Sequence, residues 1–128
     1  MPESTRPIGV DILRRLPKAE LHCHLDGSVR PETLLDLAKH RGIAMPKSTP
    51  RALREYMTVR DAQSLEDYLM RFEVTLSVMQ RADALERIAY ELAEDAHHDG
   101  VFYIEVRFCP VLNIREGLRE QDAVEAVL

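Results

Sequence analysis

The sequence is poor in several features that would narrow its class at once. It has only two cysteines, Cys23 and Cys109, too few for a disulfide scaffold, which favours a reducing compartment. No apolar run approaches the length needed to span a bilayer. The first residues lack a charged segment followed by an apolar one, so no secretion signal is predicted and we expect a cytoplasmic protein.

An excess of basic charge is also absent. The formal net charge is −5, and no basic stripe offsets it. This argues against a protein that binds nucleic acid through its phosphates, and against attachment to a membrane surface. What is present is 128 residues, 45% hydrophobic and 30% charged, which is the balance of a globular protein with the length of one ordinary domain.

Residue patterns predict a mixture of strands and helices. Strands are expected over 18–25, where polar and apolar residues alternate, and over 101–110, where β-branched and aromatic residues cluster. Helices are expected where apolar residues recur at helical spacing or capping residues frame a segment. These segments are 10–17, 30–42, 51–57, 64–80, 81–100 and a last one that begins at 120.

This order predicts an α/β fold in which parallel strands are joined by helical crossovers. Two strands cannot form a stable parallel sheet with both faces covered. We therefore expect residues 1–128 to be the N-terminal part of a longer protein. A self-contained two-stranded domain is the alternative.

The stretch "ELHCHLDGS", residues 20–28, holds the strongest chemical signal. His22 and His24 are two residues apart in a predicted strand, so their side chains should share one face with Glu20. The "DGS" turn places them at the carboxyl end of the strand, where the active sites of parallel α/β folds lie. Two buried histidines hydrogen-bonded within a core are the alternative. The strand end and the adjacent Asp26 favour a metal site.

No convincing third ligand accompanies this pair. Cys23 should face away by strand alternation, and a buried structural role is the more natural one for Cys109. The remaining histidines lie near predicted helix C-termini, where we expect them at the surface: His40, His97 and His98.

Longer segments now allow a family comparison. "LPKAELHCHLDGSVRPETLLDLA" and "GVFYIEVRFCP" resemble the first two strand regions of adenosine deaminases, and "RIAYELAEDAHHDGV" fits the helix between them. Adenine and aminofutalosine deaminases share much of this pattern. The resemblance implies the N-terminal part of a (β/α)8 barrel of the amidohydrolase kind, truncated after about two strands.

The same resemblance implies roles for individual residues. His22 and His24 would be two ligands of a single Zn²⁺ ion, with His24 also at the substrate. Asp26 and Gly27 would lie beside the nucleoside, with Asp26 accepting a hydrogen bond from a ribose hydroxyl. Adenine-specific relatives often carry glutamate at the position of Asp26, so the aspartate favours adenosine.

The segment "LEDYLMRF" matches the substrate-gating helix of that family. Its apolar pocket positions would be Leu65, Tyr68, Leu69 and Phe72, with Tyr68 where phenylalanine is expected. From spacing alone, this stripe is ordinary helix core. On the second strand, Tyr103, Glu105 and Arg107 should share a face, and we interpret them as a bracing polar layer of the barrel.

The activity implied is hydrolytic deamination of adenosine (and deoxyadenosine) to inosine (and deoxyinosine) and ammonia in purine salvage, with a purine nucleoside as the partner. The alternatives are an adenine or aminofutalosine deaminase, or a non-catalytic fragment. The proton-shuttling glutamate and the remaining ligands would come from later strands. No catalytic residue is therefore assigned in this chain, and the 128 residues alone should be inactive.

Overall fold

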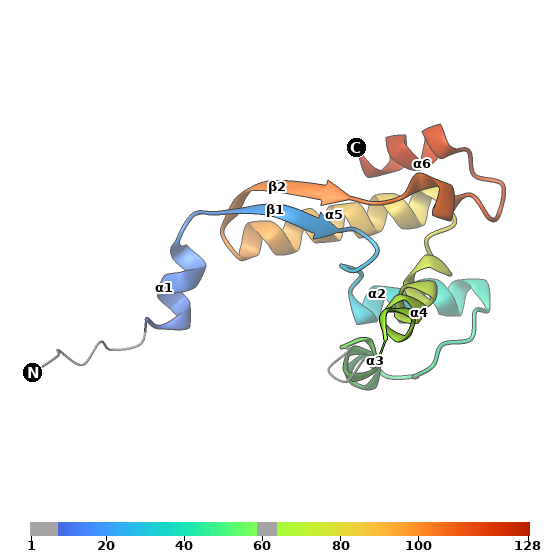
Figure 1. The fold of residues 1–128 in the computed structure, drawn as a ribbon, viewed down its shortest axis with the longest axis horizontal. Helices are drawn as coiled ribbons and strands as arrows, with labels where there is room; N and C mark the ends of the chain where they lie inside the picture. Colours follow the sequence, from blue (N-terminus) through green and yellow to red (C-terminus); the bar gives the residue numbers. More distant parts are fainter. Residues whose placement is uncertain (1–7, 59–63) are drawn as a thin grey trace, which may run out of the picture.

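The computed structural model describes residues 8–58 and 64–128, and its elements follow the predicted order (Figure 1). Strands β1 (Lys18–His24) and β2 (Val101–Arg107) form one parallel sheet. The helices within the described part are α1 (Val10–Arg15), α2 (Pro31–Arg41), α3 (Pro50–Met57), α4 (Leu65–Leu76), α5 (Ala82–His98) and α6 (Glu120–Val127), with a 3-10 helix, η1 (Pro110–Asn113), after β2. None of these described helices is long and apolar enough to cross a membrane.

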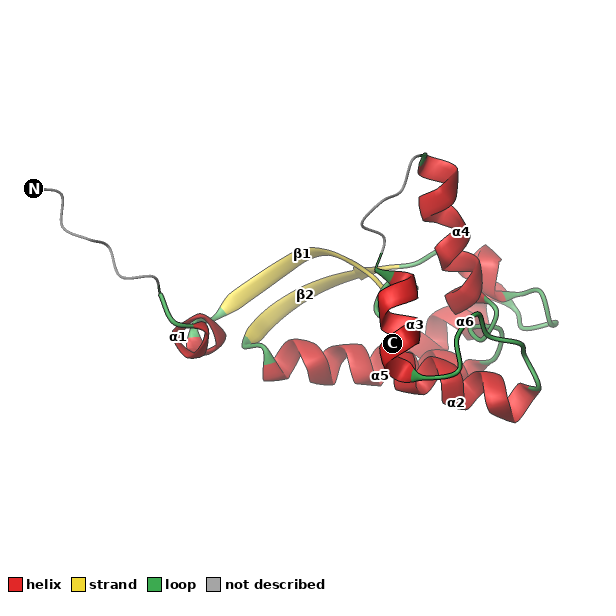
Figure 2. Cartoon of the chain, turned by 90° about the horizontal axis from the view of Figure 1, so that it is seen from below, coloured by secondary structure: helices red, strands yellow, loops and turns green. Residues whose placement is uncertain are grey.

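The two faces of the sheet have different surroundings. In Figure 2, α5 runs beneath the strands, whereas α4 rises on the opposite side near their carboxyl ends. Cys23, Ile104 and Phe108 pack into the core from the sheet. The register shifts between Glu20 and Cys23, which marks a bulge or irregularity in the part of β1 that contains His22. Such irregularities often re-aim side chains next to functional sites.

Local sequence signals explain the boundaries of α2 and α3. Pro31 is at the start of α2, and Gly42 ends that helix in the left-handed conformation, with φ of 65°. The side chain of Thr49 caps α3 by accepting a hydrogen bond from the backbone N–H of Ala52. Proline at a helix start and glycine just after a helix end are favoured for these conformational reasons.

Helix α4 is shorter than the predicted segment 64–80, because it ends at Leu76. The residues that follow form a turn that is buried beneath the segment after β2. The Gln80 amide donates to the carbonyls of Leu76 and Leu112 at 2.7 and 2.9 Å, and the Asn113 amide donates to the carbonyl of Met79 at 2.8 Å. The Leu76 and Met79 carbonyls are therefore satisfied by side-chain amides, one from the turn itself and one from Asn113, far along the chain.

The core lies where the helices meet the carboxyl end of β1. Its largest fully buried apolar side chains are Leu25, Leu34, Leu53, Val78, Met79, Leu85 and Ile88. Arg30, just before α2, joins this layer to α5 through Glu94 at 2.7 Å and Asp95 at 2.6 Å. Hydrogen bonds from Arg30 lower the pKa of Asp95 below its ordinary value.

At the amino end of the sheet, α1 is held to the turn between α5 and β2. The Lys18 ammonium donates to the carbonyl of Leu13 at 2.8 Å and lies 3.8 Å from the Asp99 carboxylate. Gly100 has φ of 79°, and a Cβ at this position would lie 2.5 Å from the carbonyl oxygen of Arg14. This contact requires glycine both for its backbone angle and for its lack of a side chain.

Candidate active site

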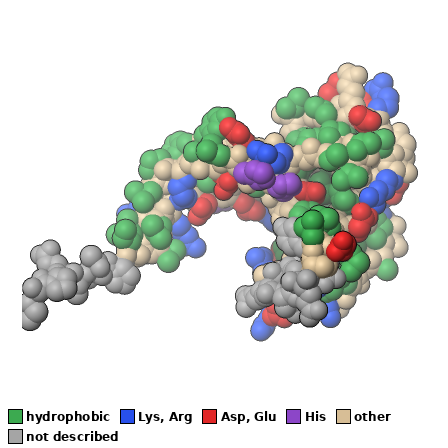
Figure 3. All heavy atoms as spheres, viewed as in Figure 1, with side chains coloured by type: hydrophobic (Ala, Val, Ile, Leu, Met, Phe, Trp, Pro, Cys, Tyr) green, Lys and Arg blue, Asp and Glu red, His purple; other side chains and the backbone are tan. Residues whose placement is uncertain are grey.

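His22 and His24 lie side by side at the carboxyl end of β1. Their Nε2 atoms are 3.2 Å apart and their ring centroids 5.2 Å apart. Strand geometry explains this meeting, because residues two apart project to the same face. Both histidines are exposed, and Figure 3 shows histidine side chains gathered beside a hollow in the surface. The structure thus brings together the two imidazoles that the sequence placed on one face.

The nitrogen spacing fits a shared metal ion. With Zn–N bonds of about 2.0–2.1 Å, a tetrahedral zinc ion places two nitrogen donors roughly 3.3 Å apart. Neutral imidazole is also a ligand that zinc accepts readily. Within residues 8–58 and 64–128, no three His, Cys, Asp or Glu side chains gather as a metal-binding group. The described residues therefore offer two well-placed donors, and a complete coordination sphere needs further ligands.

Asp26 is the second residue after β1, and its side chain lies near His24. Its Oδ1 atom lies 3.5 Å from Nδ1 of His24, close enough for attraction but long for a hydrogen bond. The same oxygen is buried and accepts no hydrogen bond from the described residues. A buried carboxylate oxygen without a donor is unfavourable unless a ligand supplies one. Asp26 is thus available to accept a hydrogen bond from a bound molecule.

The turn after β1 fixes the position of His24. The Ser28 hydroxyl donates to the His24 carbonyl at 2.6 Å, and the Ser28 backbone N–H donates to the Leu25 carbonyl at 3.1 Å. On the other side, the Leu25 N–H donates to the Arg107 carbonyl of β2 at 3.0 Å. The strand end is therefore held from both sides, which limits the freedom of the histidine side chain.

A cavity of about 530 Å³ adjoins the histidines. Helix α4 supplies one wall through Leu69 and Phe72, and the Phe72 ring centroid lies 6.4 Å from that of His24. Leu65 is 68% exposed and does not line this cavity. The side chain of Tyr68 lies outside the described residues. Of the three predicted pocket positions whose side chains are described, Leu69 and Phe72 line the cavity and Leu65 does not.

Several lining residues were not predicted from the sequence as binding residues. They are Glu20, Cys23, Ser28, Glu73, Leu76 and Leu112. Glu73 and Leu76 lie one helical turn beyond Leu69 and Phe72, so the helical repeat could have indicated them. Leu112 follows β2 and carried no comparable signal.

The two glutamates of this cavity are already engaged. Glu20 Oε1 accepts the backbone N–H of His22 at 3.0 Å. Glu73 accepts hydrogen bonds of 2.7 and 3.1 Å from the Arg115 guanidinium, which lower the pKa of the Glu73 carboxyl. Glu73 is therefore held ionised, as an acceptor and not as a proton donor.

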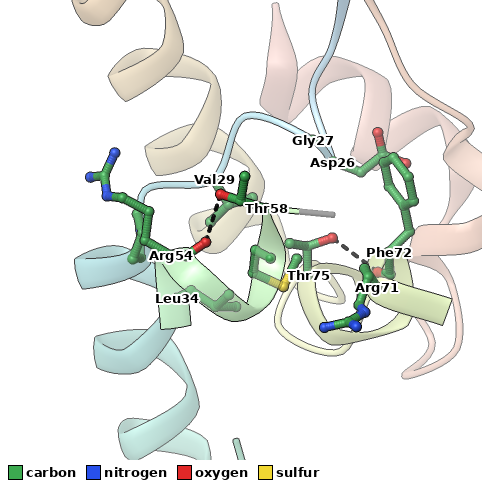
Figure 4. A pocket seen from close by; sticks show the side chains of 11 residues that line it. Asp26, Gly27, Val29, Leu34, Arg54, Thr58, Arg71, Phe72 and Thr75 are labelled. Atoms are coloured by element: carbon green, nitrogen blue, oxygen red, sulfur yellow. Dashed lines mark hydrogen bonds between the residues drawn. The ribbon is translucent and has the colours of Figure 1, made fainter. Parts of the chain in front are cut away.

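A second cavity of about 270 Å³ lies on the other side of Asp26 (Figure 4). Asp26, Gly27 and Phe72 line both cavities. Arg54 and Arg71 contribute to the walls of the smaller one. The residues that follow β1 therefore form a partition between two hollows, with the histidines in the larger one.

The polar residues of β2 make structural contacts, in agreement with their interpretation as a bracing layer. The Tyr103 hydroxyl donates to Glu105 Oε1 at 2.9 Å, which raises the pKa of Tyr103. The Arg107 guanidinium donates to the Leu21 carbonyl of β1 at 3.3 Å. The three histidines set aside as ligands are exposed, as expected, and do not line the larger cavity: His40, His97 and His98. Cys109 does not line it either, but this cysteine is exposed, so the prediction of a buried structural thiol is wrong.

Comparison with known proteins identifies the family. The family model described as adenosine deaminase matches residues 17–128. The chain belongs to the adenosine deaminase family. An adenosine deaminase of Clostridium perfringens is 44% identical over 117 residues, which cover 91% of this chain and 35% of that protein. One from Clostridium botulinum is 47% identical over 116 residues, covering 90% and 35%. The chain thus spans about a third of the length of these relatives.

Solved structures of deaminases share this fold. An amidohydrolase from Burkholderia ambifaria with bound Zn has a TM-score of 0.74 at 29% identity, covering 98% of this chain and 34% of that one. An adenine deaminase from Arthrobacter aurescens has a TM-score of 0.73 at 28% identity, covering 87% and 33%. Arabidopsis ADAL complexed with IMP has a TM-score of 0.71 at 28% identity, covering 91% and 34%. The α/β fold described above is the N-terminal part of the TIM-type barrel of such amidohydrolases.

Proposed function

We propose that this chain carries the N-terminal half of the metal site of a zinc-dependent adenosine deaminase, which converts adenosine with water to inosine and ammonia, and deoxyadenosine to deoxyinosine and ammonia. The observation that carries the proposal is the 3.2 Å approach of the His22 and His24 Nε2 atoms beside a cavity of suitable size. Family membership supports deamination as the reaction class. The Zn-bound amidohydrolase supports the choice of metal.

Zinc, when bound by the two imidazoles and further ligands, supplies Lewis-acid activation of water near neutral pH. The residues of this chain bind the metal and orient the substrate. His22 and His24 would hold the metal through their Nε2 atoms. Phe72 and Leu69 give the cavity an apolar wall that favours a purine ring and limits water. Glu73 is a poor proton donor, because the hydrogen bonds from Arg115 lower the pKa of its carboxyl, so we assign the proton transfer to a glutamate from a later strand.

Asp26 favours a nucleoside over a free base. Its buried Oδ1 atom lacks a hydrogen-bond donor, and a ribose hydroxyl would supply one. Gly27, beside it in both cavities, would border the same sugar. Adenine and aminofutalosine remain the alternative substrates, and the structural likeness to an adenine deaminase is the observation that keeps adenine in the test. We place the reaction in cytoplasmic purine salvage.

Metal analysis and an ultraviolet assay of the full-length gene product test the proposal. We expect one zinc ion per active site and a much higher kcat/KM for adenosine and deoxyadenosine than for adenine or aminofutalosine. No zinc, or preferred turnover of adenine, would contradict it. Residues 1–128 expressed alone should show no turnover of any of these purines, since no proton-transfer group is assigned among them.

The ribose contact has its own test. In the full-length protein, Asp26→Ala should raise KM for adenosine at least about tenfold, because a hydrogen bond to a charged acceptor is lost. Any residual activity on adenine should change much less, since adenine has no ribose. An equal loss on both substrates would show that Asp26 does not contact the sugar.

A further inference from the structure

Helix α4, which supplies one wall of the histidine cavity, is exposed at its amino end and buried at its carboxyl end. Leu65, Leu69 and Met70 in its first half are all more than half exposed, whereas Leu76, its last residue, is 4% exposed. The burial of this wall is therefore concentrated where α4 meets the segment that follows β2.

A single buried side chain, that of Gln80, joins these two segments. Gln80 is 3% exposed. Its Nε2 atom donates to the carbonyls of Leu76 and Leu112 at 2.7 and 2.9 Å, and its Oε1 atom accepts the backbone N–H of Arg115 at 2.9 Å. Both donors and the oxygen of the amide are thus in use. Leu76 and Leu112 each line the histidine cavity, so this amide connects two parts of the cavity wall that are far apart in the sequence.

The side chain of Arg115 makes a second connection between the same segments. Its guanidinium donates to both carboxylate oxygens of Glu73, at 2.7 and 3.1 Å, and Glu73 lies next to Phe72 on α4. This ion pair is largely exposed, so it should contribute less than the buried amide of Gln80.

The position of α4 matters because Phe72 lies close to the reactive end of β1. The Phe72 ring centroid is 6.4 Å from that of His24, and a Cβ at Gly27 would lie 3.6 Å from Cε1 of Phe72. A small shift of α4 therefore changes the space between Phe72 and His24. Breaking the contacts of Gln80 would leave buried polar groups unpaired, which is unfavourable and holds the two segments together.

We propose that Gln80 is a positioning residue for substrate binding, which sets the separation between α4 and the segment after β2, and that Arg115 reinforces it. The inference rests on the proposed function, since it assumes that the purine binds in the histidine cavity. Neither Gln80 nor Arg115 lines that cavity, so both act through the residues that do. The two histidines lie on β1, outside this network. Affinity for the nucleoside should therefore depend on Gln80, whereas affinity for zinc should not.

The test compares the wild type with Gln80→Met in the full-length protein. Methionine has a similar length and volume but can form none of the three hydrogen bonds. We expect KM for adenosine to rise about tenfold, kcat to change less than about twofold, and zinc content to stay the same, which is the pattern of lost ground-state binding.

Thr33→Val is the matched control for the loss of a buried hydrogen bond. Thr33 is 2% exposed, its hydroxyl donates to Glu91 at 2.5 Å, and it lines neither cavity. Both variants should unfold at lower denaturant concentration than the wild type, but Thr33→Val should keep the wild-type KM. An equal rise of KM in both variants, or a loss of zinc in Gln80→Met, would show a general structural role and overturn the inference.

Arg115→Met keeps the inference testable if Gln80→Met does not fold, because the Arg115 side chain is substantially exposed. KM for adenosine should rise about twofold to threefold in this variant. Its control is Arg119→Met, which removes an exposed guanidinium that pairs with Asp122 on α6, and which should leave KM unchanged. An unchanged KM in Arg115→Met, or in folded Gln80→Met, would overturn the inference and leave the deaminase proposal intact. Failure of the wild type to deaminate adenosine would instead overturn the proposed function.

Discussion

The two ends of the β1–β2 pair use their polar groups in opposite ways. At the amino end, Lys18 donates a hydrogen bond to a backbone carbonyl of α1. Gly100 lies against the backbone of the same helix, where a larger residue would clash. At the carboxyl end, the Nε2 atoms of His22 and His24 contact each other at 3.2 Å, and Oδ1 of Asp26 has no hydrogen-bond partner among the described residues. Polar groups that form hydrogen bonds within the chain stabilise the fold, whereas polar groups without such partners can bind a ligand. The same division between a stabilising end and a reactive end is general in barrels of this type.

The largest effect on activity is expected for substitutions at the carboxyl end of β1. In the full-length protein, His22→Ala or His24→Ala should abolish zinc binding and lower kcat/KM for adenosine at least about a thousandfold, because the metal loses one of its ligands. Both side chains are exposed, so thermal stability without metal should change little. Metal content and rate, measured together, check this.

His97→Ala is the matched control, because it removes an exposed histidine near the opposite end of the sheet. Zinc content and rate should match the wild type. Full zinc occupancy with an undiminished rate in the His22 or His24 variant would overturn the ligand assignment.

The second-largest effect is expected for a substitution at the amino end of the sheet, and it should change stability alone. Gly100→Ala combines a positive φ with a 2.5 Å approach to a backbone oxygen, so we expect a loss of about 2–4 kcal/mol in the free energy of unfolding. Gly42→Ala is the comparison, since Gly42 also has a positive φ but no atom within 4 Å of an added Cβ. It should lose only about 1 kcal/mol.

Denaturant unfolding of the full-length protein measures both variants, and kcat per folded molecule should stay unchanged in each. Equal losses for Gly100→Ala and Gly42→Ala would remove the close approach as a cause. A specific fall in kcat for Gly100→Ala would break the division between the two ends.

Ser28→Ala should give a smaller, mixed effect. The variant loses the 2.6 Å hydrogen bond to the His24 carbonyl, which should reduce stability by about 1 kcal/mol and weaken zinc binding several-fold, up to roughly tenfold. Ser77→Ala is matched to it, since its hydroxyl donates to the Val74 carbonyl at 2.7 Å away from the histidines. A chelator competition assay should show weaker zinc binding for Ser28→Ala only.

The smallest effect is expected for Lys18→Met. It removes the ammonium that caps the carbonyls of α1 but keeps the aliphatic stem, so we expect a loss of about 0.5–1 kcal/mol in stability. Zinc affinity and kcat should not change. Lys47→Met, in an exposed loop, should be neutral in both measurements, and a change in zinc affinity for Lys18→Met would connect the two ends.

Local patterns in the sequence predicted much of this arrangement. Strand alternation was sufficient to place His22 beside His24, and proline and glycine signals framed α2. The end of α4 was predicted four residues too late, because the apolar residues continue through the buried turn at 77–80. The amides that stabilise that turn include one from Asn113, far along the chain. Such a tertiary contact leaves no trace in local periodicity.

The candidate cavity shows the same limit. Leu69 and Phe72 could be placed on one helix face from spacing, but Leu65 lies on that stripe and is exposed. The orphaned oxygen of Asp26 and the pairing of Glu73 with Arg115 depend on how the segments pack. The residues of the site could therefore be predicted from the sequence. Which of their polar atoms are paired and which are free to bind a ligand could be learned only from the structure.

The parallel pairing of β1 with β2 also sets the timing of folding. Arg107 reaches the carbonyl of Leu21 across 86 positions in the chain, whereas the helices form from local contacts. Closing such a long loop is entropically unfavourable, and folding is slower in proteins whose contacts join residues far apart in the sequence. We therefore expect the helical layer to collapse first and the strand ends that carry the histidines to join last, so that metal capture reports the slowest phase of refolding.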